Sequence, residues 1–178
     1  RCVYETDKRL RNEWSGVLTG KGLTYGGSLA RTEATGFGLC YFTNEMLKAN
    51  GKSFKDQTVV ISGSGNVAIY ATKKATEFGA KVVALSDSNG YVYDPDGIEL
   101  EIVQQIKEVE RGRIKEYVDR TSHKNATYTE GCKGIWSIKC DIALPCATQN
   151  EIDSESAKLL AENGLSLIHI SEPTRPEP

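Results

Sequence analysis

The chain has 178 residues, enough for one domain of ordinary size and too few for two. Lysine and arginine number 22 against 24 aspartates and glutamates, so the formal net charge of −2 gives no electrostatic reason to expect nucleic acid or an anionic membrane as a partner. Hydrophobic residues make up 39% of the chain, no apolar run reaches the ~20 residues of a membrane span, and the sequence opens on charged residues rather than a signal peptide, which together predict a soluble, globular, cytoplasmic protein.

The first predicted elements lead into a glycine-rich turn. Residues 1–30 end in a stretch rich in glycine, and we expect them to be the end of one domain and its connection to the next. Apolar residues recur at helical spacing from Thr32 to Ala49, which predicts a helix ending at Asn50-Gly51. The β-branched run Thr58–Ser62 is typical of a buried strand, and a helix follows the glycine turn and runs to Phe78.

The remaining elements repeat this alternation. We predict a strand at 81–85, a small excursion at 91–97, a helix from Ile98 that turns Val109 inward, an irregular stretch at 131–139, a strand at 141–144 and a helix at 154–164. Strands that alternate with helices form right-handed βαβ units. The sequence therefore predicts an α/β fold, a Rossmann-like parallel sheet with flanking helices, incomplete at both ends, whose dinucleotide-binding domain spans residues 31–164.

The last segment, residues 165–178, differs from the rest of the chain. It resembles the translated sequence of a library adapter, so we expect it to be non-native and to contribute nothing to the fold. The alternative is a natural proline-rich tail that follows a short strand at 165–170.

The cysteines and histidines predict no metal site. Neither histidine lies at zinc-like spacing from a cysteine, and the five cysteines form an odd set without a C-x-x-C pair: Cys2, Cys40, Cys132, Cys140 and Cys146. We therefore expect no disulfide framework and interpret the cysteines as buried, reduced, small hydrophobic residues.

The strand–turn–helix at 58–78 carries the predicted chemistry. Gly63 permits a tight exit from the strand, Gly65 lets the backbone approach a pyrophosphate, and the small Ala68 lets helix and strand pack. Asp87 ends the next strand about 20 residues on, as this motif requires. A dinucleotide site is the favoured interpretation, and a glycine turn that binds no nucleotide is the alternative. Asp87 would favour NAD by the simple rule, Ser88 could donate to a phosphate, and the cofactor stays open at this point.

Three motifs together resemble one known family. The segments Gly27–Gly36, Gly63–Ala68 and Ala143–Asn150 are similar, in order and spacing, to hexameric glutamate dehydrogenases of bacteria and lower eukaryotes. The resemblance implies reversible oxidative deamination of L-glutamate to 2-oxoglutarate and ammonium in a homohexameric parent. The family's catalytic lysine and aspartate lie outside the matched positions, so we assign no catalytic residue and expect the 178-residue chain to be inactive.

The resemblance also implies which residues bind the cofactor. Thr35 corresponds to the residue at the nicotinamide end, although a position near a helix start also explains it. Asn66 lies at the dinucleotide turn, although it could simply cap the helix. The remaining implied residues are Gly63, Ser64, Gly65 and Val67 at the turn, Asp87 and Ser88 after the second strand, and Ala147, Thr148 and Gln149 in the loop after the third.

Cofactor preference rests on the same comparison. Ser64 and the pair Asp87-Ser88 resemble the NADP-using members, so we predict NADP, with NAD as the alternative. Lys107 and Arg111 compete as the basic partner of the 2′-phosphate. Two other functions stay open: a related dehydrogenase for a branched or aromatic amino acid, and a stand-alone dinucleotide-binding module without activity.

Overall fold

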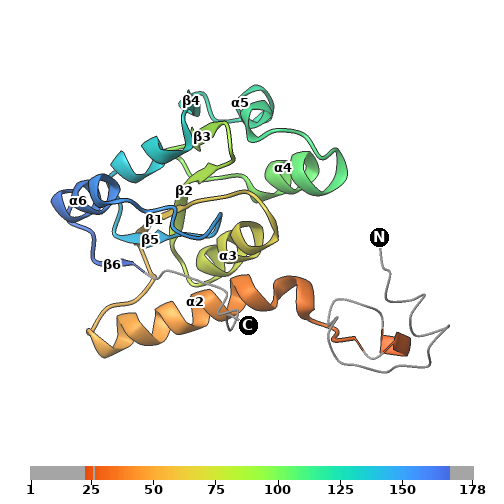
Figure 1. The fold of residues 1–178 in the computed structure, drawn as a ribbon, viewed down its shortest axis with the longest axis horizontal. Helices are drawn as coiled ribbons and strands as arrows, with labels where there is room; N and C mark the ends of the chain where they lie inside the picture. The colour runs from red at the N-terminus through yellow and green to blue at the C-terminus, as the bar shows by residue number, and fades with distance from the viewer. Residues whose placement is uncertain (1–22, 26, 169–178) are drawn as a thin grey trace.

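The computed structural model describes residues 23–25 and 27–168, which Figure 1 draws in colour. Most of the segment predicted to end a preceding domain lies outside the described residues, as do residues 169–178 of the predicted non-native tail. Leu23–Tyr25 form a 3-10 turn, η1. Among the described helices, none is both long enough and apolar enough to cross a membrane.

One mixed sheet organises the described part of the chain. Its strand order is β4-β3-β2-β1-β5-β6, with bounds Thr58–Ile61 for β1, Lys81–Ser86 for β2, Gly90–Tyr93 for β3, Thr127–Glu130 for β4, Ile142–Leu144 for β5 and Leu167–Ile168 for β6. Strands β2, β1, β5 and β6 run parallel, whereas β3 and β4 are antiparallel. The α/β class is confirmed, and the two antiparallel strands are an addition that the prediction of a parallel sheet lacked.

The parallel strands are buried on both faces, as their β-branched sequences predict. Val59 and Ile61 of β1 pack into one hydrophobic cluster, and Val60 between them packs into a second. The first cluster takes its helical residues mainly from α2 (Arg31–Ala49) and α3 (Asn66–Glu77). The second takes them from η4 (Cys132–Ser137) and α6 (Ser154–Glu162). The sheet therefore lies between two helical layers (Figure 1).

Helices α2 and α3 lie side by side below the sheet in Figure 1. Gly36 stands where they approach most tightly, since a Cβ there would lie 2.7 Å from both the Ala71 nitrogen and the Val67 oxygen. Helix α3 is followed by its C-cap Phe78 and then by Gly79, whose φ of 87° is the left-handed conformation typical of a helix-terminating glycine. Both helices confirm the predictions from apolar spacing.

The excursion between β2 and β5 is larger than expected. It contains β3, the short helix α4 (Leu100–Gln104), a π-helical turn η2 (Gln105–Val109), the 3-10 turn η3 (Ile114–Glu116), helix α5 (Tyr117–Arg120) and β4. The prediction that Val109 turns inward is wrong, because this side chain is 68% exposed. The π-helical turn shifts the register of the inward face, so Ile106 is its last buried residue.

The end of the described chain corrects one expectation. Helix α6 begins at Ser154, and the Asp153 side chain accepts a hydrogen bond from the Ser156 nitrogen as its N-cap. Leu167 and Ile168 then pair with β5 as a parallel edge strand, and Leu167 is buried. Leaving residues 165–178 out of the fold is therefore wrong for β6, which occupies part of the short strand that the alternative placed at 165–170. The non-native origin of the tail stays a prediction.

Candidate functional site

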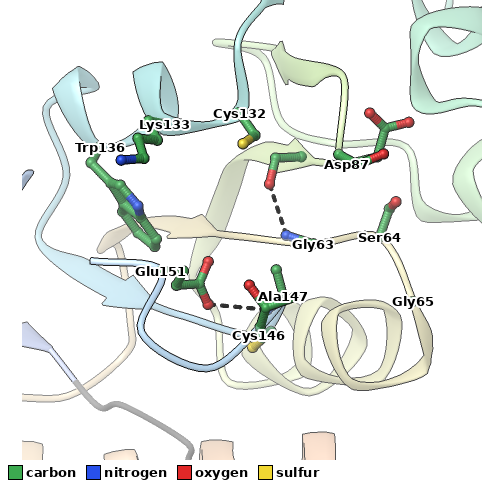
Figure 2. Close-up of a pocket in the computed structure, with 13 residues that line it drawn as sticks. Gly63, Ser64, Gly65, Asp87, Cys132, Lys133, Trp136, Cys146, Ala147 and Glu151 are labelled. Atoms are coloured by element: carbon green, nitrogen blue, oxygen red, sulfur yellow. Dashed lines mark hydrogen bonds between the residues drawn. The ribbon is translucent and has the colours of Figure 1, made fainter. Parts of the chain in front are cut away.

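A crevice of about 430 Å³ opens at the carboxyl ends of β1, β2 and β5. The chain leaves β1 toward β2 on one side and returns to β5 on the other, and such a reversal of strand order is where open α/β sheets bind ligands. Figure 2 shows Trp136, Lys133 and Glu151 on one side of the crevice and Ser64 and Asp87 on the other. The lining comprises Gly63, Ser64, Gly65, Ser86, Asp87, Ser88, Cys132, Lys133, Trp136, Cys146, Ala147, Thr148 and Glu151.

The two glycines in the turn after β1, Gly63 and Gly65, have different surroundings: the first is closely packed and the second faces open space. Gly63 has a φ of 85°, and a Cβ there would lie 3.1 Å from the Cys146 oxygen. Gly65 is the N-cap of α3, and a Cβ there would meet no atom within 4 Å. The first glycine therefore serves the fold, and the second leaves the backbone accessible from the crevice.

Two buried serines tie the strand ends together. The Gly63 nitrogen donates to Ser86 Oγ over 2.9 Å, the dashed line that ends at Gly63 in Figure 2. The Cys146 nitrogen donates to Ser62 Oγ, also over 2.9 Å. Each hydroxyl thus holds a backbone amide of a neighbouring loop, and the exits of β1, β2 and β5 become one connected unit. Of the two, only Ser86 lines the crevice.

The Asp87 carboxylate accepts three backbone hydrogen bonds, from the turn after β2 and from the start of η3. Its Oδ1 accepts from the nitrogens of Asn89 (2.8 Å) and Gly90 (3.3 Å), and its Oδ2 accepts from the Ile114 nitrogen (3.2 Å). The side chain is only 6% exposed. Asp87 therefore closes the β2–β3 turn and links the start of η3 to it. The ribose contact that the simple motif rule gives to such a residue stays a prediction.

A basic residue stands beside this turn. The Arg113 side chain is 59% exposed, and its Nη1 lies 4.0 Å from Asp87 Oδ2 and donates to Ser88 Oγ over 2.9 Å. Of the two basic residues expected here, Lys107 donates to the Gly112 oxygen instead, over 3.1 Å. Arg113, which the sequence interpretation did not select, is thus a basic residue in contact with the end of β2, and the role expected for Arg111 stays a prediction.

The loop after β5 forms the opposite wall. The Ala147 nitrogen donates to Glu151 Oε1 over 3.1 Å, and Asn150 adopts the left-handed conformation with a φ of 57°. Burial raises the pKa of the Cys146 thiol well above its ordinary value, so this thiol stays protonated. Cys132, in contrast, is exposed, so the expectation that every cysteine is buried is wrong for it.

The structure gathers most, not all, of the predicted cofactor-binding residues. Seven of them line the crevice: Gly63, Ser64, Gly65, Asp87, Ser88, Ala147 and Thr148. The others are outside its lining. Asn66 and Val67 begin α3, and Gln149 is exposed in the loop after β5. Thr35 is the fifth residue of α2, where its Oγ1 accepts from Arg31 Nη1 at 3.2 Å. Their roles toward a cofactor stay predictions.

Sequence reasoning missed six residues that line the crevice: Ser86, Cys132, Lys133, Trp136, Cys146 and Glu151. Three of them belong to η4, within a stretch predicted to be irregular. A fully apolar Ile135-Trp136 pair beside a glycine was the available signal, because such a pair must bury against the sheet.

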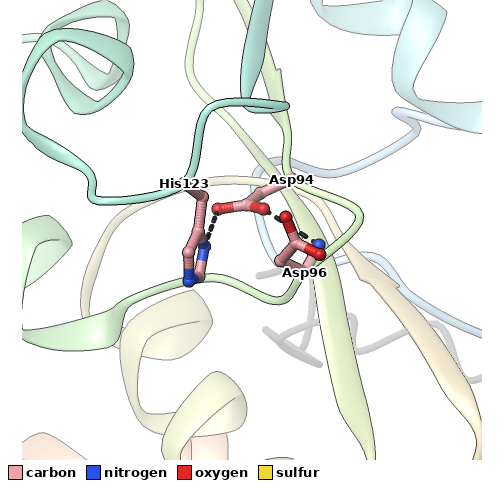
Figure 3. Close-up of side chains that lie close together, drawn as sticks. All are labelled: Asp94, Asp96 and His123. Atoms are coloured by element: carbon pink, nitrogen blue, oxygen red, sulfur yellow. Dashed lines mark hydrogen bonds and ion pairs between the residues drawn. The ribbon is translucent and has the colours of Figure 1, made fainter.

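A second polar cluster lies away from the crevice, in the excursion. Figure 3 shows the buried Asp94 between His123 and Asp96. Asp94 Oδ2 accepts from the Tyr117 hydroxyl and pairs with His123 Nδ1, each over 2.7 Å, and Oδ1 accepts from the Asp96 nitrogen at 3.0 Å. The carboxylate raises the pKa of His123, mainly through this hydrogen bond. Tyr117, His123 and the Asp96 amide therefore supply partners to the buried carboxylate, and we interpret the cluster as a link between the end of β3 and the start of α5.

With the geometry established, the chain can be compared with known proteins. A family model described as Glutamate/Leucine/Phenylalanine/Valine dehydrogenase matches residues 26–170. The chain belongs to this family. The match includes the residues of β6, in agreement with their place in the sheet.

Two curated members of the Glutamate/Leucine/Phenylalanine/Valine dehydrogenase family show the extent of the similarity. The NADP-specific glutamate dehydrogenase of Helicobacter pylori is 51% identical over 90% of this chain and 37% of its own length. The NAD(P)-specific glutamate dehydrogenase of Xylanibacter ruminicola is 49% identical over 95% of this chain and 38% of its own length. The chain thus spans little more than a third of these relatives.

Solved structures agree with this assignment. The crystal structure of Plasmodium falciparum glutamate dehydrogenase superposes with a TM-score of 0.85 at 45% identity, over 94% of this chain and 36% of that one. The crevice therefore stands in a family fold whose members carry the names of amino-acid dehydrogenases.

Proposed function

We propose that this chain is the dinucleotide-binding part of an NADP-dependent glutamate dehydrogenase, which interconverts L-glutamate with 2-oxoglutarate and ammonium. Relatives named for glutamate, at about half identity, favour this substrate over leucine, phenylalanine or valine. One observation carries the NADP assignment. At the end of β2, the Asp87 carboxylate accepts hydrogen bonds from backbone amides, and the exposed Arg113 side chain lies beside it. NAD is the alternative cofactor, and assembly as a homohexamer stays a prediction.

The crevice fits a dinucleotide. The first turn of α3 presents backbone N–H groups without intrahelical acceptors, together with the positive end of the helix dipole. The open space at Gly65 lets a pyrophosphate approach this backbone. NADP supplies the hydride chemistry when bound. The residues of this chain bind and orient the cofactor.

Recognition of the 2′-phosphate is assigned to Ser88 and Arg113. A free carboxylate at the end of β2 would repel this phosphate, but Asp87 is held by three backbone amides that spread its charge. The Arg113 guanidinium offers further donors beside Ser88 and is exposed enough to meet a ligand. This arrangement selects for a phosphate where a free aspartate would select for a hydroxyl.

A fluorescence titration of the 178-residue chain with NADPH and with NADH tests the proposal. We expect NADPH to bind more tightly, and we expect Arg113→Ala to weaken NADPH binding by roughly tenfold or more, since a hydrogen bond to a charged group contributes about 1.5–3 kcal/mol. NADH binding should change little.

The matched control is Arg111→Gly, which removes one positive charge from the same turn and keeps its left-handed backbone, with a φ of 57°. It should leave the preference for NADPH in place. Tighter binding of NADH by the unsubstituted chain, or equal losses for both nucleotides in Arg113→Ala, would contradict the NADP assignment.

A further inference from the structure

Ser86 occupies a special position among the residues that line the crevice. It is the last residue of β2 and only 3% exposed. Its Oγ accepts from the Gly63 nitrogen at 2.9 Å, and its own nitrogen donates to the Gly63 oxygen at 3.2 Å. The side chain and backbone of one residue thus hold the glycine that begins the turn.

The Ser86 hydroxyl has a proton left over. A serine hydroxyl carries one donor and two acceptor sites, and the bond from Gly63 uses an acceptor site. Within residues 23–25 and 27–168, no protein acceptor takes the proton. Because a buried polar hydrogen without a partner is costly, and because Ser86 lines the crevice, the acceptor is expected to come from a ligand there.

We propose that Ser86 is a further cofactor-binding residue, which donates its hydroxyl proton to a pyrophosphate oxygen of the dinucleotide while it accepts the Gly63 amide. The pyrophosphate is the group that this turn and the start of α3 serve in a dinucleotide fold, and it offers anionic acceptors. The two hydrogen bonds run in series from Gly63 through Ser86 to the ligand, so each polarises the other. This inference rests on the proposed function.

Ser62 supplies a matched control within the same unit. It ends β1 as Ser86 ends β2, is 1% exposed, and accepts a backbone amide, that of Cys146, over the same 2.9 Å. It does not line the crevice. Ser62→Ala and Ser86→Ala therefore remove equivalent structural bonds, and only the second removes a donor that can reach a ligand.

The experiment measures thermal unfolding and nucleotide affinity for the 178-residue chain and both variants. We expect the two substitutions to lower the unfolding temperature by similar amounts. Ser86→Ala should weaken binding of NADPH, and of ADP, which carries the diphosphate on adenosine without the nicotinamide riboside or the 2′-phosphate, by roughly tenfold each. Ser62→Ala should change either affinity less than twofold. Ser86→Thr, which restores a hydroxyl, should recover most of the lost affinity.

The outcomes separate this inference from the proposed function. If the unsubstituted chain binds neither NADPH nor NADH, the proposed function fails and the inference with it. If it binds and Ser86→Ala binds equally well, or both serine variants lose the same affinity, Ser86 has a structural role only and the inference alone is overturned. Should Ser86→Ala fail to fold, Ser86→Cys, whose thiol is a weaker donor, is held to the same criterion.

Discussion

Replacing each glycine of the turn by alanine should separate its two roles. At Gly63 the φ of 85° costs an alanine roughly 1–2 kcal/mol, the penalty of left-handed backbone for a residue with a Cβ. The new Cβ would also lie 3.1, 3.2 and 3.3 Å from the Cys146 oxygen, the Ala147 Cα and the Ala147 Cβ. Such overpacking costs roughly 1–3 kcal/mol, and the lower entropy of the unfolded chain returns about 0.4–1 kcal/mol.

The expected net loss for Gly63→Ala is about 1–4.5 kcal/mol, which lowers the unfolding temperature by roughly 2–18 °C for a chain of this size. Gly65→Ala is the matched substitution two residues on. Its φ of −87° suits alanine, and its Cβ meets no atom within 4 Å. Alanine is a poorer N-cap than glycine, but the entropy gain offsets this, so the stability should change by less than about 0.5 kcal/mol.

The nucleotide titration should give the opposite ranking. The Cβ of Gly65→Ala enters the space through which we propose a pyrophosphate reaches the start of α3, so NADPH affinity should fall while the unfolding temperature stays. Thermal unfolding followed by circular dichroism, together with NADPH fluorescence, measures both quantities. The reasoning is refuted if Gly63→Ala unfolds at the temperature of the unsubstituted chain, or if Gly65→Ala loses stability and retains its affinity.

Three further predictions concern stability outside the crevice. Since Asp94 raises the pKa of His123 above its ordinary 6.5, the stabilisation is complete below pH 6.5 and is lost as the pH rises through the raised pKa; His123→Asn should flatten this part of a urea-denaturation profile. Gly36→Ala should destabilise the chain by about 1–3 kcal/mol through its 2.7 Å contacts, whereas Gly38→Ala, with open space around it, should be neutral or stabilising by up to about 1 kcal/mol in thermal unfolding. Tyr117→Phe removes a donor to the buried Asp94 and should cost about 1–3 kcal/mol in urea denaturation, and an unchanged midpoint would show that the hydroxyl contributes nothing.

The sequence predicted the parallel part of the fold because its signals are local. The β-branched run of β1 and the apolar spacing of α2 and α3 each follow from neighbours within one element. The antiparallel strands β3 and β4 depend on pairing between Tyr91 and Thr129, which lie far apart along the chain. From sequence alone, neither of these two segments is therefore predicted to be a strand.

The candidate site shows the same limit. The glycine turn was predicted because its motif is contiguous. The structural role of Asp87 was not predicted, since the three amides that donate to its carboxylate come from positions 89, 90 and 114. Arg113 was passed over for the same reason. Its position beside Ser88 depends on where η3 is fastened, and linear spacing does not contain that information.

The way Asp87 is held has a consequence for how this crevice could change over generations. The Asp87 carboxylate holds the β2–β3 turn through backbone hydrogen bonds, while Ser88 and Arg113 beside it are exposed. Substitutions at these two surface positions can then change the coenzyme preference without breaking the hydrogen bonds that hold the β2–β3 turn. An acidic residue at this strand end therefore has a structural explanation in its three backbone hydrogen bonds, and its presence alone does not identify the coenzyme.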